Sequence, residues 1–101
     1  MMMKVKINTK ELKFRVPIVV EPDGNSFFSH SPALPGLIMD GDTEEEALNN
    51  ARLTAQDMLK IMIKDGIPIP ISLLIYDKTK NTAALTKRKG YYEEEIIVQL
   101  Q

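Results

Sequence analysis

Four carboxylates lie at predicted strand ends and turns, where a metal-dependent nuclease would place its ligands: Glu21, Asp23, Asp40 and Asp42. Aspartate is also common in turns, as at Asp23, and beside helix starts, as at Asp42, so structural roles are favoured. A residual nuclease stays open as a third hypothesis, and it requires Glu21, Asp40 and Asp42 to converge on one divalent ion.

The single histidine, His30, is the first candidate for a general base near neutral pH. The sequence sets up no serine or cysteine nucleophile around it, and a catalytic histidine needs an oriented partner. Packing or a surface hydrogen bond is therefore the favoured role for His30.

The densest basic run, at residues 87–89, is followed by Tyr91 and Tyr92, a combination that suits phosphate contact with aromatic stacking. Three glutamates follow at 93–95 and cancel the charge, whereas nucleic-acid sites show a basic face on the scale of a domain. We interpret the run as a solvated loop. No glycine-rich phosphate loop or metal-ligand spacing is present, so the residues predict no enzyme, no cofactor and no metal.

The composition is that of one globular domain. The chain has 101 residues, of which 13 are basic and 14 acidic, and a net charge of −1 provides no long-range field to hold nucleic acid or an anionic membrane. Cysteine is absent, which excludes disulfides and thiolate metal sites. No apolar run approaches the roughly 20 residues that span a bilayer. We therefore expect a single, unprocessed cytoplasmic domain over residues 1–101.

Alternating apolar residues predict a first strand over residues 14–20. Pro17 lies within it and must direct its nitrogen to an edge or to solvent, because proline cannot donate to a ladder. Pro22-Asp23-Gly24 then predicts a tight hairpin turn, and residues 26–30 the returning strand.

A loop with two prolines at residues 31–36 leads to a short apolar strand at 37–39, which completes an antiparallel meander. The clearest local signal is a helix start at Thr43, with Glu46 three residues later as a capping box. Apolar residues then recur at spacings of three and four, and Gly66 predicts the helix end.

After the helix, residues 73–76 are compatible with a short strand, and residues 77–90 are polar and rich in lysine, as in an exposed loop. A β-branched run predicts a final strand at 95–101 that returns to the sheet. The predicted class is α+β, in the order β-β-β-α-β, with one long helix packed on one face of an antiparallel meander.

The order of these features resembles the HicB-like antitoxin family over about residues 14–70. The segments that resemble the family are the first strand Phe14-Arg15-Val16-Pro17-Ile18-Val19-Val20-Glu21, the turn Asp23-Gly24, the loop Pro32-Ala33-Leu34-Pro35-Gly36, the helix entry Gly41-Asp42-Thr43 and the helix exit Asp65-Gly66-Ile67-Pro68-Ile69-Pro70. Each segment alone is a weak signal, but their consecutive order makes chance a poor explanation. Residues 72–92 have no clear counterpart and are interpreted as a variable connection.

The resemblance implies a degraded ribonuclease-H-like fold without catalytic carboxylates. It also implies an antitoxin of a type II toxin-antitoxin system, which neutralises a small HicA-type, mRNA-cleaving toxin by covering its active site. Family members commonly form dimers or tetramers, so a homo-oligomer is expected. Many carry a C-terminal DNA-binding segment, but here the predicted final strand runs directly to Gln101, so DNA binding is not expected.

The partner-binding surface is expected at the proline-containing loop and the strand before it, where these residues crowd together: Phe28, His30, Pro32, Leu34 and Pro35. An alternative stays open, in which the chain is an orphan HicB-like domain. It would then act as a homo-oligomeric protein-interaction module without a toxin.

Overall fold

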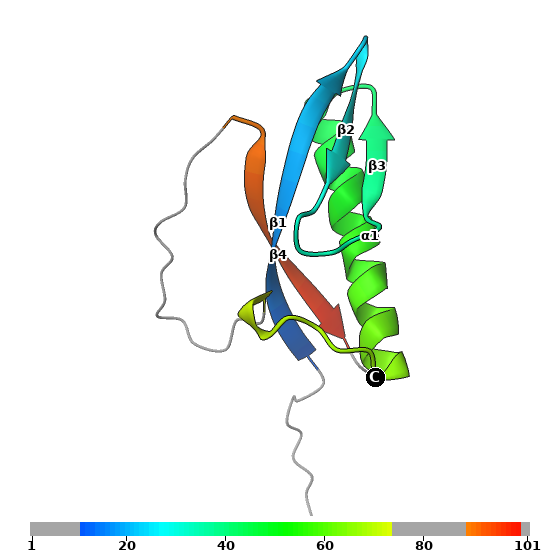
Figure 1. The fold of residues 1–101 in the computed structure, drawn as a ribbon, viewed down its shortest axis with the longest axis vertical. Coiled ribbons are helices and arrows are strands. Elements are labelled where there is room, and N and C mark those ends of the chain that lie inside the picture. Colours follow the sequence, from blue (N-terminus) through cyan, green and yellow to red (C-terminus); the bar gives the residue numbers. More distant parts are fainter. Residues whose placement is uncertain (1–10, 74–88, 100–101) are drawn as a thin grey trace, which may run out of the picture.

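The structure, a computed structural model, describes residues 11–73 and 89–99. Its elements are, in chain order, β1 (Glu11–Asp23), β2 (Ser26–His30), β3 (Ile38–Gly41), α1 (Glu44–Asp65), the short 3₁₀ helix η1 (Ile71–Leu73) and β4 (Tyr91–Gln99). The strands form one antiparallel sheet in the order β3-β2-β1-β4, and α1 contacts every strand (Figure 1). The predicted α+β fold, with three strands, a helix and a returning strand, is confirmed.

β1 is the longest strand because two different partners pair with its two parts. β4 lies opposite residues 11–19, and β2 lies opposite residues 19–23. The strand extends three residues beyond the predicted range at each end. The apolar side chains predicted to share one face are all buried in the core: Phe14, Val16, Ile18 and Val20.

Both prolines of β1 occupy positions where no backbone donor is needed. The Val20 N–H donates to the Gly90 carbonyl at 2.8 Å, so even-numbered residues of β1 direct their backbone groups toward β4, and odd-numbered residues direct theirs the other way. Pro17 therefore directs its nitrogen to the side where β2 has already ended, as predicted. Pro22 directs its nitrogen to the β4 side, beyond the start of that strand.

The hairpin between β1 and β2 is tighter than the sequence predicts. Asp23 lies opposite Ser26, so only Gly24 and Asn25 form the loop, and Gly24 has the positive φ of 66° that such a turn requires. The predicted turn is therefore displaced along the chain, because Pro22 and Asp23 still belong to β1. As a consequence, the Asp23 side chain lies on a face of the sheet.

α1 begins and ends where the sequence predicts. Thr43 Oγ1 accepts a hydrogen bond from the Glu46 N–H at 3.0 Å, and Glu46 Oε1 accepts one from the Asp42 N–H at 2.8 Å. Gly66, with φ of 71°, closes the helix and donates to the Ile63 carbonyl. With 22 residues, the helix is about 33 Å long.

Small residues allow α1 to approach the sheet closely near its start. The buried helix residues are Ala47, Ala51, Ala55 and Leu59. A Cβ on Gly41 would lie 2.5 Å from the Ala47 nitrogen, so β3 and the helix backbone meet with no room for a side chain. The buried Ser29 hydroxyl donates to the Ala47 carbonyl at 2.8 Å, which satisfies the polar group that β2 directs into this region.

The region after α1 departs from the predictions. β4 begins at Tyr91, four residues before the predicted final strand, so Tyr91 and Tyr92 belong to a strand and not to the connection. The glutamates do not interrupt the strand, because Glu93 and Glu95 lie on its exposed side. Residues 71–73 form η1, and the rest of the strand considered at 73–76 lies outside the described residues, as do residues 87 and 88 of the basic run. Within the described ranges, no helix is long and apolar enough to cross a membrane.

Candidate functional site

Alternation along the strands gives the sheet a second face, opposite the one that packs against α1. It carries the odd-numbered residues of β1 and β4 and the even-numbered residues of β2 and β3. None of the described side chains on this face is buried, whereas the other face carries the core residues of β1 and β4. We call it the open face.

The strand register brings apolar and aromatic side chains from all four strands into one row across the open face. Ile38, His30, Val19 and Tyr91 lie opposite one another in the order β3-β2-β1-β4. Phe28 stands in the next row, between Asp40 on β3 and Glu21 on β1. The open face therefore combines accessible apolar surface with a border of carboxylates, which is typical of protein interfaces.

His30 connects the two rows. Its Nε2 lies 2.9 Å from Glu21 Oε2, and since an ionised carboxylate can only accept, Nε2 carries the hydrogen. The imidazole also stacks on the Phe28 ring, with centroids 5.7 Å apart and an interplanar angle of 24°. Of the two roles favoured for His30, packing or a surface hydrogen bond, the structure shows the hydrogen bond, and the ring contact helps to hold Phe28 in place.

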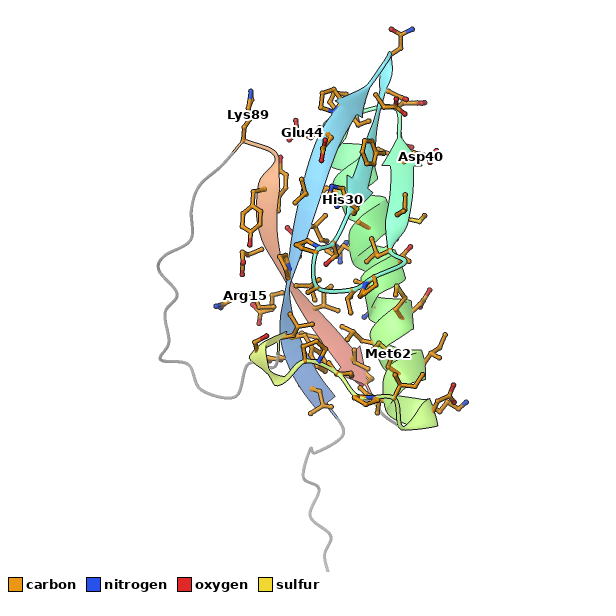
Figure 2. All side chains as sticks on the ribbon, viewed as in Figure 1. Arg15, His30, Asp40, Glu44, Met62 and Lys89 are labelled. Atoms are coloured by element: carbon orange, nitrogen blue, oxygen red, sulfur yellow. The ribbon has the colours of Figure 1, made fainter. Side chains whose placement is uncertain are left out.

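A hollow of about 470 Å³ lies beside Phe28 on the β2–β3 side of the sheet. We call it the β2–β3 hollow; it is lined by Asp23, Phe28, Ile38, Met39 and Asp40. Figure 2 shows Asp40 on β3, the strand beside that of His30. Ile38 is 66% exposed, the highest value among the exposed large apolar residues of the described chain. The hollow thus has an apolar floor with a carboxylate on either side.

The carboxylates do not form the metal site that a nuclease would need. Glu21 is bonded to His30, and Asp40 lies on the far side of Phe28. Asp42 lies just before α1, where its N–H donates to Glu46. Within residues 11–73 and 89–99, no group of three or more histidine, aspartate or glutamate residues is placed to hold a metal ion.

The structure separates the five residues predicted to bind a partner. Phe28 and His30 lie on the open face, and Pro32 and Pro35 are exposed in the loop after β2. The prediction that Leu34 belongs to the partner-binding surface is corrected, because Leu34 is only 1% exposed and belongs to the core. The Ser31 hydroxyl accepts the N–H groups of Ala33 and Leu34 at 3.1 and 3.2 Å, which turns the loop so that Leu34 points inward.

Four residues that line the hollow were not among the five predicted to bind a partner: Asp23, Ile38, Met39 and Asp40. The sequence indicated that Asp23 and Asp40 lie at turns or strand ends and that Ile38 belongs to a short apolar strand. Their position around Phe28 was not visible, because it depends on the register between three strands.

A second hollow, of about 450 Å³, lies beside the start of α1, and Arg52 and Glu94 are among its lining residues. Several of its polar groups have partners: Thr43 caps the helix, and Arg52 donates to Asn49 at 2.7 Å and approaches Glu94 at 3.9 Å. The approach of Arg52 to Glu94 is one of the contacts between α1 and β4.

Near this second hollow, the Tyr92 hydroxyl donates to Glu44 in the first turn of α1. This hydrogen bond raises the pKa of Tyr92, and burial and the charges of Glu44 and Glu94 raise it further. The contact joins β4 to the helix start on the core side of the sheet.

Comparison with protein-family models, with curated proteins and with solved structures found no match to this chain.

Proposed function

We propose that this chain is the antitoxin of a type II toxin-antitoxin system, and that it neutralises a small HicA-type, mRNA-cleaving toxin by covering its active site. The observation that carries the proposal is the open face, where Phe28, His30 and Ile38 are accessible on a rigid sheet. The resemblance of residues 14–70 to the HicB-like family supports the choice of partner. A toxin that cleaves mRNA would place the pair in the cytoplasm.

The chemistry of the open face favours protein contact over catalysis. Aromatic and aliphatic side chains surrounded by polar groups are typical of the centres of protein interfaces. His30 is engaged by Glu21 and stacked on Phe28, and both contacts fix the shape of the surface. The backbone beneath these residues belongs to a four-stranded sheet, so the surface needs little ordering when a partner binds.

The test is co-expression with the small protein encoded next to this gene, followed by size-exclusion chromatography and a growth assay. A stable complex and restored growth are the expected results. If the chain elutes without the neighbour and restores no growth, the antitoxin proposal is wrong.

Matched variants locate the surface in the same assay. Ile38→Ala removes exposed apolar surface from the open face, and Leu53→Ala does so on α1, where Leu53 is 47% exposed. We expect Ile38→Ala to weaken the complex and Leu53→Ala to leave it unchanged, because only the first lies on the proposed interface. The reverse result would place the interface on the helix.

The orphan, homo-oligomeric alternative is supported by β4. β4 pairs with β1 along one edge, and no described strand pairs with its other edge. The Gln56 side chain of α1 donates to the Ile97 carbonyl there at 2.7 Å, so a second copy could extend the part of that edge before Ile97. Odd-numbered residues of β4 direct their N–H groups to that edge, so Glu95→Pro removes a donor there and leaves the β1 ladder intact. Under this alternative, light scattering should show an oligomer that Glu95→Pro dissociates.

A further inference from the structure

We infer that the β2–β3 hollow accepts an arginine side chain presented by the partner protein. The inference rests on the proposed protein-binding function and adds the chemistry that the partner must bring. It is carried by the unpaired carboxylates of the hollow, by its aromatic floor, and by the contrast with the other end of the open face.

Three carboxylates surround Phe28, and in the part of the chain that the structure describes only one of them, Glu21, has a basic side chain as its partner. Asp40 and Glu21 lie directly opposite Phe28 on the two neighbouring strands, and Asp23 lies on the diagonal. Glu21 is paired with His30 at 2.9 Å. Across residues 11–73 and 89–99, neither Asp23 nor Asp40 has a cationic side chain within 4 Å. The two carboxylates of the hollow are therefore available to a positively charged group of a partner.

The floor of the hollow selects the kind of cation. Phe28 and Ile38 offer aromatic and apolar surface, which a strongly hydrated metal ion or ammonium group does not use. A guanidinium stacks on an aromatic ring, forms forked hydrogen bonds to carboxylates, and has an aliphatic stem that covers apolar surface. The His30 imidazole stacks on the Phe28 ring, and this contact favours one orientation of the ring.

The other end of the open face shows the contrast. There, Arg15 lies directly opposite Glu95, and Lys13 is two residues away on the same strand face, so the chain supplies both signs of charge. At the β2–β3 end, the carboxylates of Glu21, Asp23 and Asp40 share the open face of β1, β2 and β3 with one basic side chain of these strands, that of His30. Electrostatic complementarity therefore directs a basic partner surface to the hollow and not to the rest of the face.

The first test uses the full chain and short capped peptides, so it does not depend on the toxin. A peptide of alternating glycine and arginine is titrated into ¹⁵N-labelled protein, and the same peptide with citrulline in place of arginine is the uncharged control. We expect saturable shifts of the amides of Phe28, Ile38 and Asp40 with the arginine peptide only. A lysine peptide should bind more weakly, because ammonium does not stack as guanidinium does.

The double variant Asp23→Asn/Asp40→Asn should weaken arginine-peptide binding about fivefold, as expected for two exposed charge pairs. The matched control, Glu45→Gln/Asp57→Asn, removes the same charge from exposed positions on α1 and should leave binding unchanged. Equal losses in both variants, or shifts spread over all the carboxylates, would show unspecific attraction and overturn the inference. Equal binding of the arginine and lysine peptides would also overturn it.

A second test distinguishes this inference from the proposed function. If the neighbouring protein binds the chain, Asp23→Asn/Asp40→Asn should slow association and reduce its salt dependence. A complex that forms with unchanged affinity and salt dependence in this variant would leave the antitoxin proposal standing and refute the arginine site. Arginine-peptide binding without any toxin complex would support the arginine site and contradict the antitoxin proposal.

Discussion

Phe14 and Phe28 belong to the same sheet but lie on opposite faces. Phe14 is 2% exposed and packs in the core, whereas Phe28 remains partly accessible between Asp40 and Glu21. Along both strands, successive side chains point to opposite faces of the sheet. The residues on one face pack in the core and stabilise the fold, whereas the residues on the other face remain accessible to solvent. The comparison teaches that core packing and accessible surface are separated along each strand by a single residue step.

The two faces also differ in how they treat polar groups. On the core side, the described polar groups have specific partners, such as the Ala47 carbonyl for Ser29 and Glu44 for Tyr92. On the open face, Asp23 and Asp40 have no ionic partner among the described residues. A buried polar group needs a hydrogen-bond partner within the protein, whereas an exposed polar group can be hydrated by water until a binding partner replaces that water.

The sharpest test of the comparison is the same substitution on each face. Phe14→Ala should lower the free energy of unfolding by about 3–5 kcal/mol, because it leaves a cavity in the core. Phe28→Ala should lower it by less than about 1.5 kcal/mol, because the ring is only partly buried. Urea denaturation measures both values, and similar losses would show that the open face is part of the core.

Neighbouring residues of β3 offer a second pair. Gly41→Ala should cost about 2 kcal/mol of stability, because the new Cβ would lie 2.5 Å from the Ala47 nitrogen and the helix must shift. Asp40→Ala, one residue earlier on the open face, should change stability by less than about 0.5 kcal/mol. Thermal melts of the two variants check the prediction, and a tolerated Gly41→Ala would mean that α1 is not held closely against β3.

The two tyrosines of β4 make a third pair. Tyr92→Phe should cost about 1 kcal/mol at neutral pH, since it removes the hydrogen bond to Glu44 on the core side. Tyr91→Phe removes a similar bond to Glu93, 2.9 Å long and exposed, and should cost less than about 0.5 kcal/mol.

The Tyr92 contribution should also depend on pH. Because the pKa of Tyr92 is raised in the folded state, its stabilising effect is complete below the ordinary tyrosine pKa of about 10 and is lost as pH rises through the folded-state pKa. The difference in stability between the unmodified protein and Tyr92→Phe should therefore be constant from neutral pH to about pH 9 and shrink above about pH 10. A difference that persists at high pH would contradict the role assigned to the hydroxyl.

The smallest effect is expected at the balanced end of the open face. Arg15→Gln removes the charge opposite Glu95 and should change stability by less than about 0.5 kcal/mol, as is usual for exposed pairs. Arginine-peptide binding at the β2–β3 hollow should stay unchanged or become slightly tighter, because a positive charge is removed. A clear loss of peptide binding would extend the binding surface along β1.

Local chemistry explains which elements were predicted well. β2 was predicted at its observed bounds, and the Thr43 and Gly66 caps marked both ends of α1, because turns and caps depend on neighbouring residues. The start of β4 was missed because Tyr91 and Tyr92 were assigned to the connection at 72–92 and the final strand was predicted to begin only at Glu95, although Glu93 and Glu95 both lie on the exposed side of the observed strand. The burial of Leu34 was also missed, because the bonds to Ser31 that turn the loop inward follow no simple periodicity.

The sequence by itself determined the α+β class, the order of the elements, the core side of β1 and both ends of the helix, because periodicity and capping act over a few residues. Only the tertiary structure decided that β4 lies beside β1 and that Asp23, Phe28 and Asp40 meet around one hollow. Pairing between strands depends on the fit of side chains far apart in the chain, and a change of register by one residue would turn each of these groups to the opposite face.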